Sequence, residues 1–352
     1  MAKMKIGIIL GGLSSEKDIS LESGRNIYSK IDRKKYDPIP IFMDCQSCLW
    51  EIPLKLLMRN STRDIEDDLL EEATPLRYED LKNWIDLAFL ALHGKYGEDG
   101  CLQGVLELIG VPYTGSGVLA SALGMDKDFS RILLAASGID VPKTVAVEKA
   151  DWEGAGQDAI LDRIANEIGF PCVIKPSREG CSTAVAKIVS RESIGQALKN
   201  AFVWDSKALV EEFLIGTEVT CGVLEGENPF PLIPSETIPT DADSILSLED
   251  KFLYGKGENK TPARLPEAML QKIQEAALAT FRALNLRCYA RIDMFALEDG
   301  RVVVLEPNTQ PGMTPSTVLF HQAAAMNMTQ SALIDLIIAA ALKAHETKKG
   351  PL

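Results

Sequence analysis

The stretch that decides the fold is residues 290–308, ARIDMFALEDGRVVVLEPN, which predicts two apolar strands joined by the turn LEDGRV. Side chains two positions apart on a strand share a face, so Arg291 and Asp293 point together. The same spacing aligns Glu306 with Asn308, and the hairpin brings all four into one patch. Two carboxylates and an amide suit Mg²⁺ beside phosphate oxygens, and an arginine can stabilise a negative transition state. The alternative is a solvated sheet face with ion pairs.

A lysine at the end of another apolar strand indicates phosphate binding. Lys175 directly precedes the segment 176–184, PSREGCSTA, whose backbone N–H groups can hold phosphates. The lysine precedes the glycine, so this is not a Walker A loop. Lys127 at a helix start and Lys251 in a glycine-containing loop can add charge, although a single lysine is more often a surface residue. Cys181 in this segment is a nucleophile, a metal ligand or a replacement for a hydroxyl.

The preceding chain alternates strands and helices. Strands are predicted at 5–10, 37–43 and 85–92 and helices at 19–31 and 101–110, while the polar stretch up to about residue 82 has no clear pattern. This alternation implies an α/β fold whose parallel sheet carries ligand groups at the carboxyl ends of its strands. Shorter strands and helices follow from about Asp126. The three predicted units are 1–125, 126–216 and 217–352.

Composition excludes several classes of protein. A chain of 352 residues exceeds what one core organises, and its net charge of −13 argues against a nucleic-acid partner. No apolar run is long enough for a signal peptide or a membrane span, so we expect a cytoplasmic protein without a membrane partner.

The seven cysteines are scattered and odd in number, which disfavours disulfides. CQSC at residues 45–48 has redox or zinc spacing but no second pair, which favours ordinary free thiols over a metal or redox site.

These features together resemble a known family. A strand ending in Lys175, a glycine loop, VEEFLIGTE, RID and LEPN occur in the order of the ATP-grasp carboxylate–amine ligases. The segments GGLSSEKDISLESG, LHGKYGEDGCLQGVLELIGVPYTGSGVLASALGMDK, KPSREG and NTQPGMT narrow the resemblance to the D-alanine–D-alanine ligases, over nearly the whole chain. It implies an ATP-grasp fold with an N-terminal Rossmann-like parallel-sheet domain, a small central ATP-binding subdomain and a C-terminal catalytic α+β domain.

The resemblance also implies an activity and its residues. The family joins two D-alanines through an acyl phosphate, using ATP and two Mg²⁺ (or Mn²⁺) ions, for peptidoglycan precursors, and a homodimer is expected. ATP would be held by Lys127, Lys175, Ser182, Glu211, Leu214, Glu218 and Lys251. The metal ions would be held by Asp293, Glu306 and Asn308. The amino-acid substrates would meet Glu16, His93, Cys181, Phe252 and Thr317, and the oxyanion would meet Arg291 and Gly312.

Three positions depart from the family pattern. Cys181 stands where the family has Ser, Phe252 where it has Tyr, and Thr317 where it has Ser. In the family the first two hydroxyls join Glu16 in a hydrogen-bonded triad that orders the lid, so we expect this lid to be held by packing. The departures leave two alternatives: a ligase that uses another acceptor such as D-lactate, and a non-catalytic nucleotide-binding relative.

Overall fold

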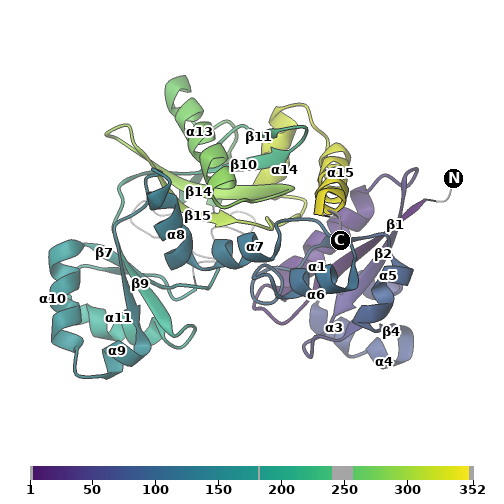
Figure 1. The fold of residues 1–352 in the computed structure, drawn as a ribbon, viewed down its shortest axis with the longest axis horizontal. Helices are drawn as coiled ribbons and strands as arrows, with labels where there is room; N and C mark the ends of the chain where they lie inside the picture. Colours follow the sequence, from purple (N-terminus) through teal and green to yellow (C-terminus); the bar gives the residue numbers. More distant parts are fainter. Residues whose placement is uncertain (1–2, 181–182, 240–256, 349–352) are drawn as a thin grey trace.

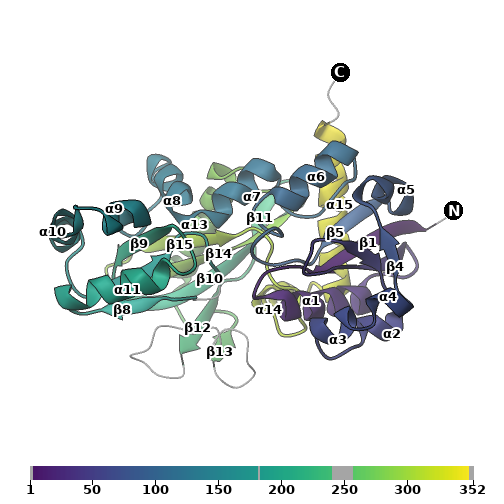
Figure 2. The same ribbon diagram turned by 90° about the horizontal axis from the view of Figure 1, so that it is seen from below.

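The computed structural model describes residues 3–180, 183–239 and 257–348, which form three β-sheets. Figure 1 shows the N-terminal sheet with its helices at one end of the molecule, the central sheet at the other end and the C-terminal sheet between them. The view in Figure 2 has the same arrangement. The predicted mixed α/β class is confirmed, and the predicted unit boundaries after residues 125 and 216 stay predictions.

The N-terminal sheet has the strand order β4-β3-β2-β1-β5. β1 (Met4–Gly11) pairs in parallel with β2 (Tyr36–Met43) and β5 (Leu87–Leu90), as predicted. The stretch without a clear pattern adds two short antiparallel strands, β3 (Leu49–Glu51) and β4 (Thr74–Leu76), at the edge. The helices of this region are α1 (Lys17–Lys30), α2 (Leu54–Leu57), α3 (Thr62–Glu66), α4 (Leu69–Glu72), the 3₁₀ helix η1 (Tyr78–Asp80), α5 (Leu81–Trp84) and α6 (Cys101–Ile109).

The central sheet is wholly antiparallel, with the order β6-β9-β7-β8. Its strands are β6 (Thr144–Glu148), β7 (Cys172–Pro176), β8 (Ala186–Ile188) and β9 (Lys207–Glu212). The helices before and around it are α7 (Val118–Met125), α8 (Lys127–Ala136), α9 (Lys149–Glu153), α10 (Gln157–Glu167), the 3₁₀ helix η2 (Arg191–Ser193) and α11 (Ile194–Ala201). Asp126 caps α8 by accepting from the backbone N–H groups of Asp128 and Phe129, which fixes where Lys127 begins the helix.

The C-terminal sheet has the order β13-β12-β10-β14-β15, and β11 also pairs with β10. Its strands are β10 (Gly216–Glu225), β11 (Pro229–Pro231), β12 (Ser235–Pro239), β13 (Gly257–Lys260), β14 (Tyr289–Leu297) and β15 (Val302–Asn308). The predicted hairpin is confirmed, because β14 and β15 pair antiparallel. The helices are α13 (Glu267–Ala283), α14 (Val318–Ala325) and α15 (Gln330–Lys348).

The last helix joins the two ends of the chain in one core. Ile334 and Ile337 of α15 belong to the same buried cluster as Ile8 of β1 and Phe89 of β5. The opposite face of the N-terminal sheet packs against α6 through Leu106. In the described part of the chain no single helix is long and apolar enough for a membrane span. The helices α14 and α15 reach that length and apolarity only when they are taken together, and the chain bends by 101° between them.

We predict that Gly24→Ala destabilises the protein by about 1–3 kcal/mol, because overpacking a filled core strains it. A Cβ on Gly24 of α1 would lie 2.5 Å from Leu10 Cδ2 of β1. Gly104→Ala in α6 is the matched control, since its Cβ would meet nothing closer than 4.0 Å and alanine favours helix by up to about 1 kcal/mol. Urea unfolding measures both, and equal effects of the two substitutions would contradict the close approach of α1 to β1.

Candidate active site

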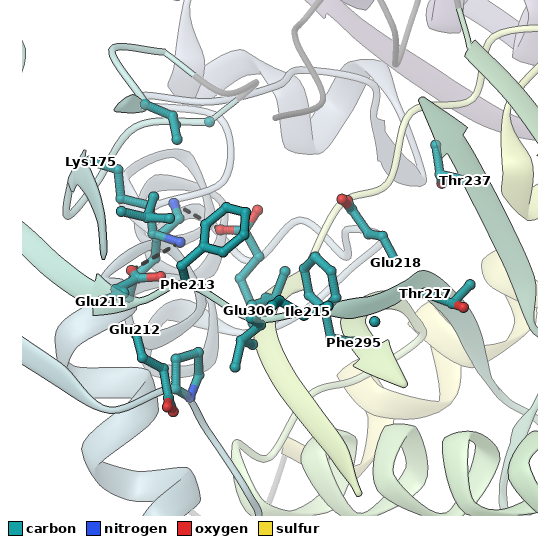
Figure 3. Close-up of a pocket in the computed structure, with 18 of the residues that line it drawn as sticks. Lys175, Glu211, Glu212, Phe213, Ile215, Thr217, Glu218, Thr237, Phe295 and Glu306 are labelled. Atoms are coloured by element: carbon teal, nitrogen blue, oxygen red, sulfur yellow. Dashed lines mark ion pairs between the residues drawn. The ribbon is translucent and has the colours of Figure 1, made fainter. Parts of the chain in front are cut away.

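A cavity of ≈ 480 Å³, within the range of small-molecule sites, lies between the central and C-terminal sheets. Its walls include the rings of Phe213 and Phe295. Figure 3 shows Lys175 on one side of these rings and Glu218 on the other. The described residues predicted to bind ATP all line this cavity: Lys127, Lys175, Glu211, Leu214 and Glu218.

The buried carboxylate of Glu211 holds two cations at one end of the cavity. Its Oε1 lies 3.0 Å from Lys175 Nζ and 2.5 Å from Arg131 Nη1, and the Glu211 and Arg131 side chains are at least 95% buried. Burial alone would raise the pKa of the Glu211 carboxyl, but Arg131 and Lys175 together lower it. Burial lowers the pKa of the Lys175 amine to about 8, although Glu211 acts in the opposite direction.

Arg131 is a site residue that the sequence analysis missed. Its Nε and Nη2 donate to the Leu305 carbonyl of β15 at 3.1 and 3.0 Å, and its Nη1 donates to Thr144 Oγ1 of β6 at 3.2 Å. Arg131 therefore links α8 and both sheets that bound the cavity. Its position four residues after Lys127 was a usable signal, because residues four apart lie on one helix face.

Lys127 joins the same end of the cavity from the start of α8. Its Nζ lies 3.1 Å from Glu306 Oε2 and donates to the Glu179 carbonyl at 2.7 Å. Glu179 immediately precedes Gly180, so this lysine contacts both the predicted glycine loop and the β15 carboxylate. Lys127 of α8 and Lys175 of β7, both predicted to bind phosphates, therefore lie at the same end of the cavity.

The β14–β15 hairpin places the predicted acidic and amide residues opposite one another. Asp293 pairs with Glu306, and Arg291 pairs with Asn308. Arg291 Nε and Nη2 donate to the two oxygens of Asp293 at 2.9 and 2.8 Å, and Thr220 Oγ1 donates to Asp293 at 2.7 Å. The predicted shared patch is therefore present.

The metal that the family resemblance implies would find hard ligands in this patch. Asp293 and Glu306 supply carboxylates and Asn308 an amide oxygen, the donor types that Mg²⁺ prefers. Arg291 and Lys127 pair with the two carboxylates in this structure. Within residues 3–180, 183–239 and 257–348, no group of three or more His, Cys, Asp or Glu side chains is arranged around a metal position. The donor set fits Mg²⁺, and its role stays a prediction.

Glu16 lies where two glycine-containing loops meet. A Cβ on Gly180 would lie 3.1 Å from Glu16 Oε1, and one on Gly94 would lie 3.6 Å from Glu16 Oε2. The carboxylate therefore approaches the backbone of the central loop and that of the loop after β5. Glycine permits this approach because it has no side chain.

His93 is buried and connects to the segment that contains Gly312. Its Nε2 lies 3.0 Å from Ser23 Oγ, which accepts from the Met313 N–H at 3.0 Å. Asn26 also donates to the Met313 carbonyl at 2.9 Å, so α1 holds this segment. The structure thus brings the predicted His93 and Gly312 regions together.

Gly312 and Thr317 lie at the start of the last helical region. A Cβ on Gly312 would meet no protein atom within 4 Å, so its surface is open to a ligand. Thr317 is the residue before α14, and its carbonyl accepts from the Phe320 N–H at 3.1 Å. Its predicted contact with the amino-acid substrate stays a prediction.

Comparisons with known proteins identify the family of this chain. The family model described as D-ala D-ala ligase N-terminus matches residues 5–116, and D-ala D-ala ligase C-terminus matches residues 133–339. The chain belongs to the D-alanine–D-alanine ligase family. A D-alanine–D-alanine ligase of Geobacillus thermodenitrificans is 35% identical to it, over 99% of this chain and 98% of that relative.

Solved ligase structures confirm the predicted ATP-grasp fold. The VanG D-Ala:D-Ser ligase of Enterococcus faecalis superposes with a TM-score of 0.85 and 29% identity, over 97% of this chain and 100% of that one. A D-alanine–D-alanine ligase of Bacillus anthracis, complexed with ATP, gives a TM-score of 0.75 and 31% identity, over 98% and 99%.

Some predicted ligase residues lie outside the described part of the chain: Cys181, Ser182, Lys251 and Phe252. Six other cysteines are free thiols, of which Cys172, Cys221 and Cys288 are buried in the apolar interior. The other three, Cys45, Cys48 and Cys101, are exposed on loops or at the start of a helix.

We predict that Glu211→Gln lowers the free energy of unfolding by about 3–5 kcal/mol, because it leaves the buried Arg131 and the largely buried Lys175 without their carboxylate. Glu298→Gln, in the exposed turn of the hairpin, is the control and changes it by no more than about 0.5 kcal/mol. Denaturant unfolding at neutral pH measures both variants. A loss below about 1 kcal/mol in Glu211→Gln would show that the ion pairs do not hold the two sheets.

Proposed function

We propose that this chain is an ATP-dependent ligase that joins two D-alanines into D-alanyl-D-alanine, a peptidoglycan precursor. The observation that carries the proposal is that Lys127, Lys175 and Glu306 line one end of a nucleotide-sized cavity, and that Glu306 lies opposite Asp293 on the hairpin that also holds Arg291 and Asn308. The chain is similar over nearly its full length to D-alanine–D-alanine ligases. These relatives do not favour the D-lactate acceptor or the non-catalytic alternative.

In the first step, a carboxylate oxygen of one D-alanine attacks the γ-phosphorus of ATP, and ADP leaves. Lys127 and Lys175 attract the phosphates, while Glu211 and Arg131 fix Lys175 in position. Asp293, Glu306 and Asn308 would hold the two metal ions, and bound Mg²⁺ supplies charge neutralisation at the phosphate oxygens.

In the second step, the neutral amine of the other D-alanine attacks the acyl carbon, a C–N bond forms and phosphate leaves. Arg291 stabilises the tetrahedral oxyanion together with the backbone at Gly312. Glu16 binds the ammonium group of the first D-alanine, with His93 near its carboxylate. Acyl phosphates hydrolyse in water, so the loops around Gly180 exclude solvent during the reaction.

The cellular setting follows from the same proposal. ATP and D-alanine are its small-molecule partners, which suits a cytoplasmic enzyme that does not bind nucleic acid or membranes. We also propose a homodimer.

The first test is product analysis by mass spectrometry after incubation with ATP, Mg²⁺ and D-alanine, with and without equimolar D-lactate. We expect D-alanyl-D-alanine in both mixtures at neutral and mildly alkaline pH, with one phosphate released per dipeptide. Depsipeptide in the mixed reaction would establish another acceptor. Nucleotide binding without product would establish the non-catalytic alternative.

We predict that ATP binding weakens above pH 8. The pKa of the Lys175 amine is about 8, so the amine is charged below pH 8 and attracts phosphate directly. Above pH 8 the amine is mostly neutral, and it must take up a proton when ATP binds, which weakens the binding. Titration calorimetry at pH 7 and 9.5, in buffers of different ionisation enthalpy, measures Kd and proton uptake. Lys175→Arg stays charged and should flatten this dependence, whereas the exposed control Lys199→Arg should not. Identical pH profiles for Lys175→Arg and the unmodified protein would contradict this role.

A further inference from the structure

One row of side chains crosses the C-terminal sheet on the face that borders the cavity. β10 pairs with β14 so that Glu218 lies opposite Phe295. β12 pairs with β10 so that Glu236 lies opposite Val219, and the next position along this register sets Thr237 opposite Glu218. Opposite residues on paired strands share a face, with Cβ atoms about 4.5–5.5 Å apart. The row therefore presents an aromatic ring, a carboxylate and a hydroxyl in that order.

These three side chains all line the cavity. Figure 3 shows Phe295 and Glu218 near its middle and Thr237 at the edge away from Lys175. Among the three, the family resemblance implies a role for Glu218 alone. Thr237 is a pocket residue without an assigned function.

A neighbouring amide fixes the hydroxyl of Thr237. Asn259 of β13 lies opposite Thr237, and Thr237 Oγ1 donates to Asn259 Oδ1 at 3.0 Å. An amide oxygen can only accept, so the hydroxyl proton is committed to Asn259 and the Thr237 oxygen is left as an acceptor. The row thus presents two adjacent acceptors, a carboxylate and an oriented hydroxyl oxygen, to the cavity.

Two adjacent acceptors match a pair of neighbouring O–H donors. Phosphate oxygens are acceptors themselves and a carboxylate repels them, so this part of the cavity disfavours the phosphates that Lys127 and Lys175 attract. Within ATP, the neighbouring O–H donors are the two ribose hydroxyls. The aromatic ring on the other side of Glu218 provides an apolar surface next to that position.

We propose that Thr237 is a second ribose-binding residue, which accepts a hydrogen bond from one ribose hydroxyl of ATP beside Glu218 and favours ribonucleotides over deoxynucleotides. The inference rests on the proposed function, because it takes ATP as the nucleotide. Asn259 acts as a positioning residue that orients the Thr237 hydroxyl.

The test removes the hydroxyl from the protein and from the nucleotide in combination. Dipeptide formation is measured for the unmodified protein, Thr237→Val and Thr237→Ser with ATP, 2′-deoxy-ATP and 3′-deoxy-ATP. We expect Thr237→Val to lower kcat/KM for ATP roughly 3- to 10-fold, mainly through KM. For the analogue that lacks the bonded hydroxyl, Thr237→Val should have the same kcat/KM as the unmodified protein. With ATP, Thr237→Ser should have a kcat/KM close to that of the unmodified protein. Thr74→Val on the exposed edge strand β4 controls for the substitution itself.

Two results would overturn the inference: an equal loss in Thr237→Val with all three nucleotides, which indicates packing, or no loss with ATP. Failure of the proposed function is distinguishable, because the unmodified protein would then form no dipeptide from ATP. In that case calorimetric Kd values for the same nucleotides and variants give the same comparison without turnover.

Discussion

The Glu211 carboxylate, held between Arg131 and Lys175, is the interaction on which the cavity depends. These three charges come from α8, β7 and β9, and Arg131 also donates to the Leu305 carbonyl of β15. Removing one partner from a buried pair leaves an uncompensated charge that costs several kcal/mol. The central sheet therefore cannot move away from β15 without breaking this cluster. The contacts of Glu211 with Lys175 and Arg131 therefore hold the Lys175 ammonium at the cavity and also join the central sheet to β15.

The remaining parts of the site are organised around that cluster by separate regions of the chain. The β14–β15 hairpin brings Asp293 opposite Glu306, and Lys127 reaches Glu306 from α8. Ser23 and Asn26 of α1 hold Met313 through its backbone. Polar contacts thus join all three regions of the chain. Such a junction suits an acyl phosphate, which must be formed and consumed away from water.

The apolar part of the cavity separates two kinds of polar environment. Lysines surround the end near Glu211, whereas acceptor oxygens of Glu218 and Thr237 lie across the rings of Phe213 and Phe295. An anionic group is attracted to the first and repelled from the second, while hydroxyl donors have the opposite preference. This asymmetry sets one direction for a bound nucleotide. Its physical source is the placement of a few charges in a confined space.

The sequence by itself determined the local elements and the residues that they carry. The alternation of side chains along a strand was enough to predict that Arg291, Asp293, Glu306 and Asn308 lie together, because one short turn joins their two strands. Lys175 and Lys127 were recognisable from their places at a strand end and a helix start. Only the tertiary structure decided which distant groups meet them: Arg131 with Glu211, His93 with Ser23, and Thr237 with Asn259. These contacts depend on strand order and helix placement, which arise from packing over the whole chain and leave no fixed spacing in the sequence.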